Sequence, residues 1–112
     1  MDSETLKKLV IDALEDVKGQ AIACLDVRGL TSVADYMVVV TGTSGRHLRA
    51  LADEVSKKAR EAGCAVIGME GEEQAEWILL DLGDVIVHVM LAATRQLYDL
   101  EALWSLGASR AK

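Results

Sequence analysis

Proline and phenylalanine are absent from this chain of 112 residues, and aromatic residues are scarce. Without proline, low-complexity runs or repeats, nothing marks a linker. We therefore expect one domain over residues 1–107 and a frayed tail at 108–112. Hydrophobic residues make up 51% of the chain, which excludes a disordered protein. With two Trp, two Tyr and no Phe, the core must be mainly aliphatic, so the few aromatic side chains are the ones to explain.

Cysteines and long apolar runs are also sparse. Cys24 and Cys64 lack CxxC spacing, which predicts small buried thiols in a reducing compartment rather than a disulfide or a metal pair. No apolar run reaches membrane-spanning length, and the first residues lead directly into an acidic helix without an apolar signal region. The sequence therefore predicts a soluble, cytoplasmic protein.

Positive charge is in the minority, with twelve Lys and Arg against eighteen Asp and Glu, and the net charge is −6. A protein that grips a nucleic-acid backbone normally presents a basic face, so this balance predicts little direct contact with nucleic acid. A basic protein partner fits better, because opposite charge speeds the encounter of two proteins.

Hydrophobic periodicity predicts the order of the secondary-structure elements. Apolar residues at helical spacing, with Asp2 or Ser3 as the cap and Gly19 at the exit, predict a first helix. Ser44 as the N-cap and Gly63 at the end predict a second. The remaining chain predicts strands at 21–27, 36–42 and 65–67, an acidic loop at 68–74, a hairpin at 77–90 and a helical segment at 95–107.

The run 36–42 is β-branched and nearly all apolar, which is typical of a strand covered on both faces. Together with the order of elements, it predicts an α/β domain with a mixed sheet and helices over at least one face.

The predicted hairpin divides its side chains unevenly. A two-residue turn at Leu82 and Gly83 would place Trp77 opposite His88, and side chains alternate between faces along each strand. A three-residue turn with Gly83 in the left-handed region would shift the pairing by one and stays open. With the two-residue turn, one face is wholly aliphatic, with Ile78, Leu80, Val85, Val87 and Val89. The other face collects Trp77, Leu79, Asp81, Asp84, Ile86, His88 and Met90.

Two groups of residues could carry phosphate or metal chemistry. Residues 42–45 (Gly-Thr-Ser-Gly) join a strand to a helix, where backbone N–H groups bind anions. They lack the Lys-Ser/Thr ending of a P-loop and the GxGxxG spacing, so helix capping is the favoured interpretation. Asp81 and Asp84 could hold Mg²⁺, but Asp beside a tight turn is ordinary turn chemistry. We therefore expect no catalytic site, no metal and no cofactor.

The histidine and the clustered aromatic residues need a separate interpretation. No Cys or second His is placed to form a zinc site with His88. Trp104 is expected in the core of the domain. Trp and Tyr are enriched at interface hot spots, and Met suits adaptable contact surfaces. If no helix covers it, the sheet face with Trp77 and Met90, and with Tyr98 nearby, would be an exposed hydrophobic patch. Such a patch predicts a binding site for another protein.

Four segments together resemble one known family. They are DYMVVVTGTSGRHLRALADEV at 35–55, Glu70-Gly71, WILLDLGDVIVHVM at 77–90 and RQLYDLEALW at 95–104. The combination W-x(3)-D-x-G-D-x(3)-H followed by R-x(2)-Y-x-L-E-x(2)-W is specific. The chain is similar, over nearly its whole length, to the ribosomal silencing factor family (Iojap, RsfS). Met37 and Met90 stand where members often have Phe, a change of similar bulk.

The resemblance implies a nucleotidyltransferase-like α/β fold without known catalysis. It also implies a translation repressor that binds the large ribosomal subunit at large-subunit ribosomal protein fourteen and blocks joining of the small subunit when nutrients run low. The implied contact surface maps onto Trp77, His88, Met90 and Tyr98, and we include Leu79 from the same predicted face.

Three further possibilities stay open from the sequence. A nucleotidyltransferase-like enzyme would use Gly42, Ser44, Asp81 and Asp84, and nucleotide binding would separate it from a repressor. A large-subunit assembly factor would share the repressor's partner. An open sheet edge or an exposed apolar face is also compatible with a homodimer.

Overall fold

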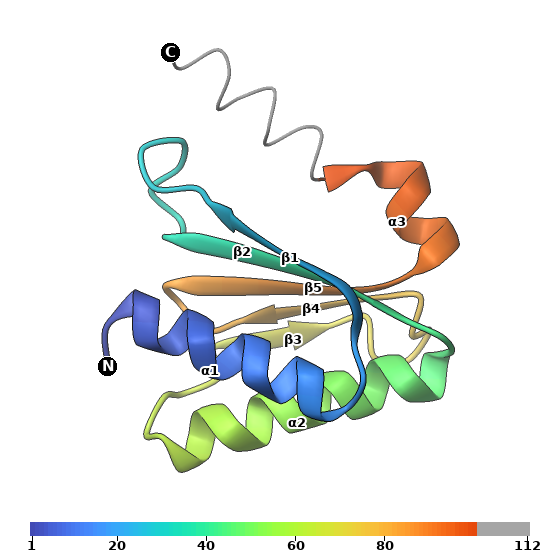
Figure 1. Ribbon diagram of the computed structural model, residues 1–112, viewed down its shortest axis with the longest axis horizontal. Coiled ribbons are helices and arrows are strands. Elements are labelled where there is room, and N and C mark those ends of the chain that lie inside the picture. The colour runs from blue at the N-terminus through green and yellow to red at the C-terminus, as the bar shows by residue number, and fades with distance from the viewer. Residues whose placement is uncertain (101–112) are drawn as a thin grey trace.

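The computed structural model describes residues 1–100, in which five strands form one mixed β-sheet flanked by three helices (Figure 1). In chain order the elements are α1 (Ser3–Asp16), β1 (Gln20–Asp26), β2 (Tyr36–Gly42), α2 (Gly45–Glu61), β3 (Gly68–Glu70), β4 (Trp77–Asp81), β5 (Val85–Leu91) and α3 (Ala92–Tyr98). The strands lie in the order β1-β2-β5-β4-β3. Only the β2–β5 pair is parallel among these described strands. The predicted α/β fold with a mixed sheet is confirmed.

The two longer helices begin at the predicted capping residues. Asp2 Oδ1 accepts a hydrogen bond from the Thr5 N–H at 2.8 Å, and Ser44 Oγ accepts one from the His47 N–H at 3.1 Å. Both caps satisfy N–H groups that have no partner inside the helix. Local side-chain chemistry therefore fixes where α1 and α2 start.

The main core lies between the sheet and the pair α1 and α2, which cover one face of the sheet (Figure 1). All seven residues of β2 are buried, as predicted for a strand covered on both faces. Burial of each large aliphatic side chain contributes roughly 1.5–3 kcal/mol, so this layer dominates stability. The predicted aliphatic face of the hairpin packs here and is fully buried, with Ile78, Leu80, Val85, Val87 and Val89.

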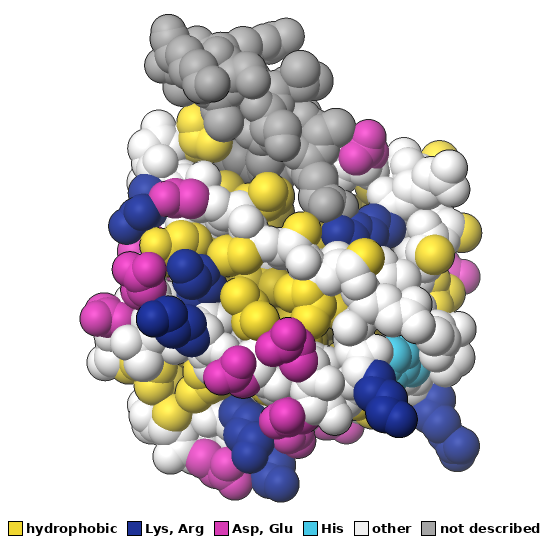
Figure 2. Space-filling view, viewed as in Figure 1, with side chains coloured by type: hydrophobic (Ala, Val, Ile, Leu, Met, Phe, Trp, Pro, Cys, Tyr) yellow, Lys and Arg dark blue, Asp and Glu magenta, His cyan; other side chains and the backbone are white. Residues whose placement is uncertain are grey.

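The outer surface of the helix side carries charges of both signs. Figure 2 shows Lys and Arg side chains intermingled with Asp and Glu on this side, with hydrophobic side chains gathered above α1. Every helix within residues 1–100 is too short or too polar to span a bilayer.

The hairpin turn is displaced by one residue from the predicted position. Gly83 and Asp84 form the turn, so Leu79 faces His88 and Trp77 faces Met90, and the predicted pairing of Trp77 with His88 is wrong. Gly83 has a φ of +88°, and its N–H donates to Asp81 Oδ1 at 2.8 Å. Leu82 remains in the ladder through its N–H bond to Val85 O at 3.0 Å. The pairing moves by two residues, so the two predicted faces keep their members.

Three other local predictions differ from the structure. The strand expected at 65–67 lies at Gly68–Glu70, inside the predicted acidic loop, because Gly68 pairs with Asp81. The terminal helix begins at Ala92 rather than 95 and ends at Tyr98, where Asp99 adopts a left-handed φ of +43°. Residues 101–107 of the predicted segment, Trp104 and the tail at 108–112 lie outside the described residues.

The two cysteines are free, but only one is even partly shielded. Cys64 is half-buried, whereas Cys24 is exposed on β1, so the prediction of two buried thiols is wrong for Cys24. The physical reason is that β1 is an edge strand in which no side chain is fully buried.

Candidate protein-binding face

The sheet face opposite α1 and α2 carries the unusual residues of the hairpin. Trp77, Leu79 and Ile86 are half-buried there, whereas His88 and Met90 are buried. Tyr98 reaches this group from α3 and is 55% exposed. We call the set Trp77, Leu79, Ile86, His88, Met90 and Tyr98 the second face. The structure thus brings together all five predicted partner-binding residues, although at different depths.

Trp77 joins the histidine and the tyrosine into one unit. Its Nε1–H donates to His88 Nδ1 at 2.9 Å, along the diagonal of the two strands rather than straight across. On its other side, the Trp77 ring lies 4.8 Å from the Tyr98 ring, with the two planes tilted by 46°. Tilted aromatic pairs of this kind contribute about 0.5–1.5 kcal/mol beyond their buried area. The orientation of Trp77 is therefore fixed from two sides.

His88 is held neutral at this position. An indole N–H can only donate, so Nδ1 of His88 accepts and its own proton lies on Nε2. Burial lowers the pKa of His88 to about 4, because the charged form loses hydration in the sheet. A charge on His88 would also remove the acceptor that orients Trp77.

Met90 belongs to a small second core under this face. It is fully buried and packs with Val27, Met37 and Val39, and the half-buried Trp77 lies against the same cluster. Val27 and Met37 come from distant parts of the sequence, so the hairpin pattern alone gives no sign that Met90 is covered. Met90 supports the position of Trp77 from below.

The first turns of α3 are tied to the sheet. Arg95 Nη1 donates to Ala21 O at 2.7 Å and to Thr41 Oγ1 at 2.9 Å, which places the end of α3 beside Trp77. Next to Tyr98, Leu97 is 77% exposed. Leu97 was not among the residues predicted from the sequence. An apolar residue adjacent to Tyr98 on a short helix was the available signal.

The residues considered for phosphate or metal chemistry have structural roles here. Besides the Ser44 cap, His47 Nδ1 accepts the Thr43 N–H at 2.9 Å, and its Nε2 lies 2.7 Å from Val17 O, so the ring joins the α2 start to the end of α1. Asp81 accepts the N–H of Gly83 in the turn. Within residues 1–100, no three His, Cys, Asp or Glu residues gather in a geometry suited to a metal ion.

Acidification is expected to destabilise the protein through His88. The folded-state pKa of about 4 lies below the ordinary value of 6.5, so the unfolded chain takes up the proton first as the pH falls. The contribution of neutral His88 to the free energy of unfolding is fully present above pH 6.5. It falls by about 2–3 kcal/mol as the pH drops towards 4. Urea denaturation of the wild type and His88→Gln at pH 7 and 4.5 measures the difference. Equal losses in both proteins would contradict the assignment, because the carboxylates contribute equally to each.

These elements define an α/β domain with two long helices on one face of a mixed sheet, and with Trp77 and Tyr98 gathered on the opposite face. Solved structures share this fold. A crystal structure of a Chromobacterium violaceum protein matches with a TM-score of 0.92 and 51% identity, covering 94% of this chain and 88% of that one. One from Bacillus halodurans matches with a TM-score of 0.83 and 38% identity, covering 90% and 94%. The nucleotidyltransferase-like detail stays a prediction.

The family model described as "Ribosomal silencing factor during starvation" matches residues 1–112. The ribosomal silencing factor RsfS of Chromobacterium violaceum is 52% identical over 104 residues, or 93% of this chain and 85% of that protein. A mouse protein named mitochondrial assembly of ribosomal large subunit protein 1 is 31% identical over 88% of this chain and 44% of its own length. The chain belongs to the ribosomal silencing factor family, which confirms the resemblance found in the sequence.

Proposed function

We propose that this protein represses translation by binding the large ribosomal subunit through large-subunit ribosomal protein fourteen and blocking the joining of the small subunit. Membership of the silencing-factor family supports the ribosome as the target. The net charge of −6 supports a basic protein, rather than RNA, as the direct contact. The site of action is the cytoplasm.

The observation that carries the proposal is the aromatic unit of Trp77 and Tyr98. Tyr98 is 55% exposed and packs at a tilt against a Trp that is itself held by His88. Rigid, preoriented Trp and Tyr side chains are the commonest hot spots of protein interfaces, since they lose little conformational entropy on binding. A monomer gains little from holding such a unit at its surface.

The burial of each second-face residue indicates its role in the proposed contact with the ribosomal protein. Trp77, Leu79 and Tyr98 reach the surface and make the direct contacts with the ribosomal protein. His88 and Met90 are buried and act as positioning residues for Trp77. This mode of action is steric: a factor bound to the face of the large subunit that meets the small subunit excludes the small subunit, so no catalysis is needed.

Co-sedimentation with purified large subunits tests the binding step, and light scattering on adding small subunits tests the block. We expect stoichiometric co-sedimentation and a loss of the scattering increase that accompanies joining. Binding without any effect on joining would contradict the repressor mechanism. No binding to large subunits at micromolar concentrations would contradict the whole proposal.

A role in assembly of the large subunit is the second candidate, supported by the name of the mouse relative. It shares the partner but predicts a different defect. Cells that lack an assembly factor accumulate precursor large subunits during growth, whereas cells that lack a repressor keep translating during starvation. Sucrose-gradient profiles from growing and starved deletion strains separate the two roles.

Self-association is expected through the same surface that meets the ribosome. The half-buried Trp77 and the exposed Tyr98 leave apolar area in water, at a cost of about 25 cal/mol per Å². A homodimer that covers this area must dissociate before it binds large subunits, so dimerisation and ribosome binding compete. Analytical ultracentrifugation gives the dimer affinity, and a cross-linked dimer gives the test. If that dimer binds large subunits as well as the free protein does, the two surfaces are distinct.

A further inference from the structure

A groove runs between α2 and the free edge of the sheet at β3. One hollow in it has a volume of about 310 Å³, with Ala52 and Ile78 in its walls. A neighbouring hollow of about 470 Å³ includes Ser56 and Val66. Met69 and Asp53 line both, so the two hollows follow one another along the groove. This groove lies on the helix side of the sheet, because Met69 pairs with the core residue Leu80, whereas the second face lies on the other side.

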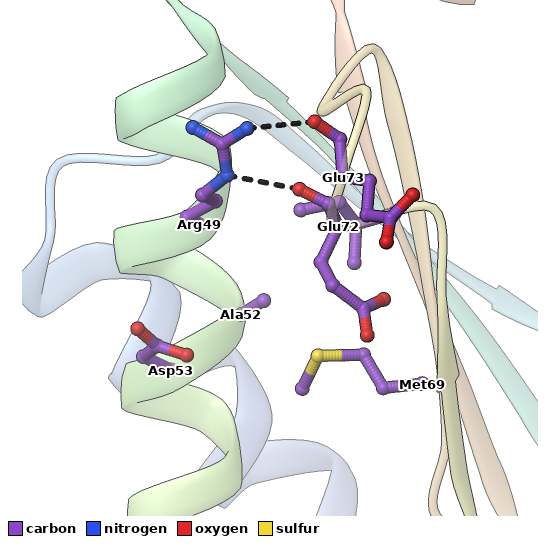
Figure 3. Close-up of a pocket in the computed structure, with 7 residues that line it drawn as sticks. Arg49, Ala52, Asp53, Met69, Glu72 and Glu73 are labelled. Carbon is purple, nitrogen blue, oxygen red and sulfur yellow. Dashed lines mark hydrogen bonds between the residues drawn. The ribbon is translucent and has the colours of Figure 1, made fainter.

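The first hollow is acidic above an apolar floor. Asp53 from α2 and Glu72 and Glu73 from the β3–β4 loop line it, against one guanidinium, that of Arg49. Figure 3 shows the Glu72 side chain extending from the loop toward Met69, across from α2. None of the three carboxylates takes part in any of the ion pairs found within residues 1–100. The Asp53 and Glu72 carboxylates are therefore available to a cationic group that enters the hollow, whereas the Glu73 side chain points away from α2 (Figure 3).

Arg49 fixes the position of the loop that lines the groove. Its Nε donates to Glu72 O and its Nη2 to Glu73 O, both at 2.9 Å (Figure 3). The guanidinium thereby pins the backbone of the loop to α2 and leaves the carboxylates of the loop uncommitted. A preformed groove of this kind binds a ligand without the cost of ordering a loop.

The second hollow holds a buried polar group in need of a partner. Ser56 is 6% exposed, and within the described part of the chain its hydroxyl has no hydrogen-bond partner. An unsatisfied buried hydroxyl costs about 1–3 kcal/mol, so native proteins rarely leave one. Ser56 lines the hollow, but its Oγ is itself covered, so a polar group of a ligand reaches it after a neighbouring side chain moves aside.

The strand beside the groove also offers backbone partners. β3 is the last strand of the described sheet, so one of its edges carries unpaired N–H and C=O groups. An extended peptide can add to such an edge, and its alternate side chains then point to one side of the sheet. On the helix side those side chains meet the two hollows.

We propose that the α2–β3 groove binds an extended, basic peptide segment of a partner protein, which pairs with the edge of β3 and places an arginine or lysine side chain beside Asp53 and Glu72. The groove is separate from the second face and does not depend on the proposed ribosome contact. The ammonium or guanidinium group pairs with the carboxylates, its aliphatic stem covers Met69 and Ala52, and a backbone or side-chain donor reaches Ser56 Oγ.

Fluorescence anisotropy with a short fluorescein-labelled peptide of alternating threonine and arginine tests this proposal in about 50 mM salt, where screening is modest. We expect binding that weakens about tenfold or more in the double variant Asp53→Asn/Glu72→Gln. The matched control is Glu15→Gln/Asp16→Asn, which removes the same charge from exposed positions on α1 and should bind as the wild type does. Ser56→Ala should bind more weakly while its melting temperature stays the same or rises.

Three results of the binding assay would overturn the proposal. The first is no binding of the arginine peptide, and the second is equal weakening in the groove variant and the α1 control, which would mean attraction by net charge alone. The third is a peptide with every backbone amide N-methylated that binds equally well, because it has no N–H left to pair with β3. Methyl NMR shifts at Met69 and Ile78 on titration support the groove, whereas shifts confined to the second face contradict it.

Discussion

Tyr98→Ala is expected to weaken binding to the large ribosomal subunit by about 30- to 1,000-fold and to leave the melting curve nearly unchanged. Truncation of a central aromatic anchor costs on the order of 2–4 kcal/mol of binding free energy. The cost in folding is small, because Tyr98 is more than half exposed, and the aromatic contact that it loses is the one with Trp77. Co-sedimentation and thermal denaturation of the same preparation measure both quantities.

Trp77→Ala should behave differently, because Trp77 serves both the surface and the fold. Its loss removes the donor to His88 Nδ1 and uncovers Met90, so binding and melting temperature should both fall. Truncation of a fully buried Trp costs about 3–5 kcal/mol of stability, and this half-buried one should cost less. Trp77→Phe keeps the ring and isolates the effect of the lost N–H bond.

Leu80→Ala is the matched control for stability. Leu80 is fully buried on the helix side, so its truncation should cost about 2–5 kcal/mol of folding and leave the affinity of the folded protein intact. A Tyr98→Ala protein that binds like the wild type would show that the ribosome contact lies elsewhere. If Tyr98→Ala melts as early as Leu80→Ala, Tyr98 is part of the core.

The elements that sequence predicted best are those decided by adjacent residues. The β-branched run of β2 and the caps at Asp2 and Ser44 depend on side-chain chemistry within a few positions. The separation of the hairpin into an aliphatic and an aromatic face is equally local, because it depends only on alternation along each strand. All of these are confirmed.

The register of the hairpin could not be decided in the same way. Turns at Leu82–Gly83 and at Gly83–Asp84 give the same two faces, so hydrophobic segregation cannot distinguish them. The choice is made by tertiary contacts: Leu82 is 4% exposed and joins the core, and Asp81 accepts the N–H of Gly83. Neither contact can be read from the alternation of residues.

The grouping of the second-face residues was predicted, but their depth in the structure was not, and their role in partner binding stays a prediction. Trp77, Leu79, His88, Met90 and Tyr98 do gather, yet the burial of Met90 depends on Val27 and Met37, which belong to other parts of the chain. The groove beside β3 was not predicted from the sequence, for a related reason. The stretch at 65–67 has the higher β-propensity, but pairing with β4 selects Gly68–Glu70 as the strand.

The glycine whose replacement should cost the most directly follows β3. Gly71 has a φ of +90°, a conformation that residues with a Cβ rarely adopt. A Cβ built on Gly71 would also overlap the carbonyl oxygen and carbon of Trp77. The first residue of β4 therefore lies too close to Gly71 for any side chain, and β4 carries Trp77 into the second face.

Gly71→Ala is expected to destabilise the protein by about 3–5 kcal/mol, because strain at this φ adds to a clash that only a backbone shift can relieve. Two other glycines separate these causes. Gly63 has a φ of +82° with open space around it, so Gly63→Ala should cost only the strain of about 1–2 kcal/mol. Gly68 has neither a positive φ nor a close neighbour, so Gly68→Ala should be nearly neutral. Urea denaturation of the three variants gives the order. If Gly71→Ala and Gly63→Ala lose the same stability, the contact with Trp77 relaxes freely, and Gly71 is required for its backbone conformation alone.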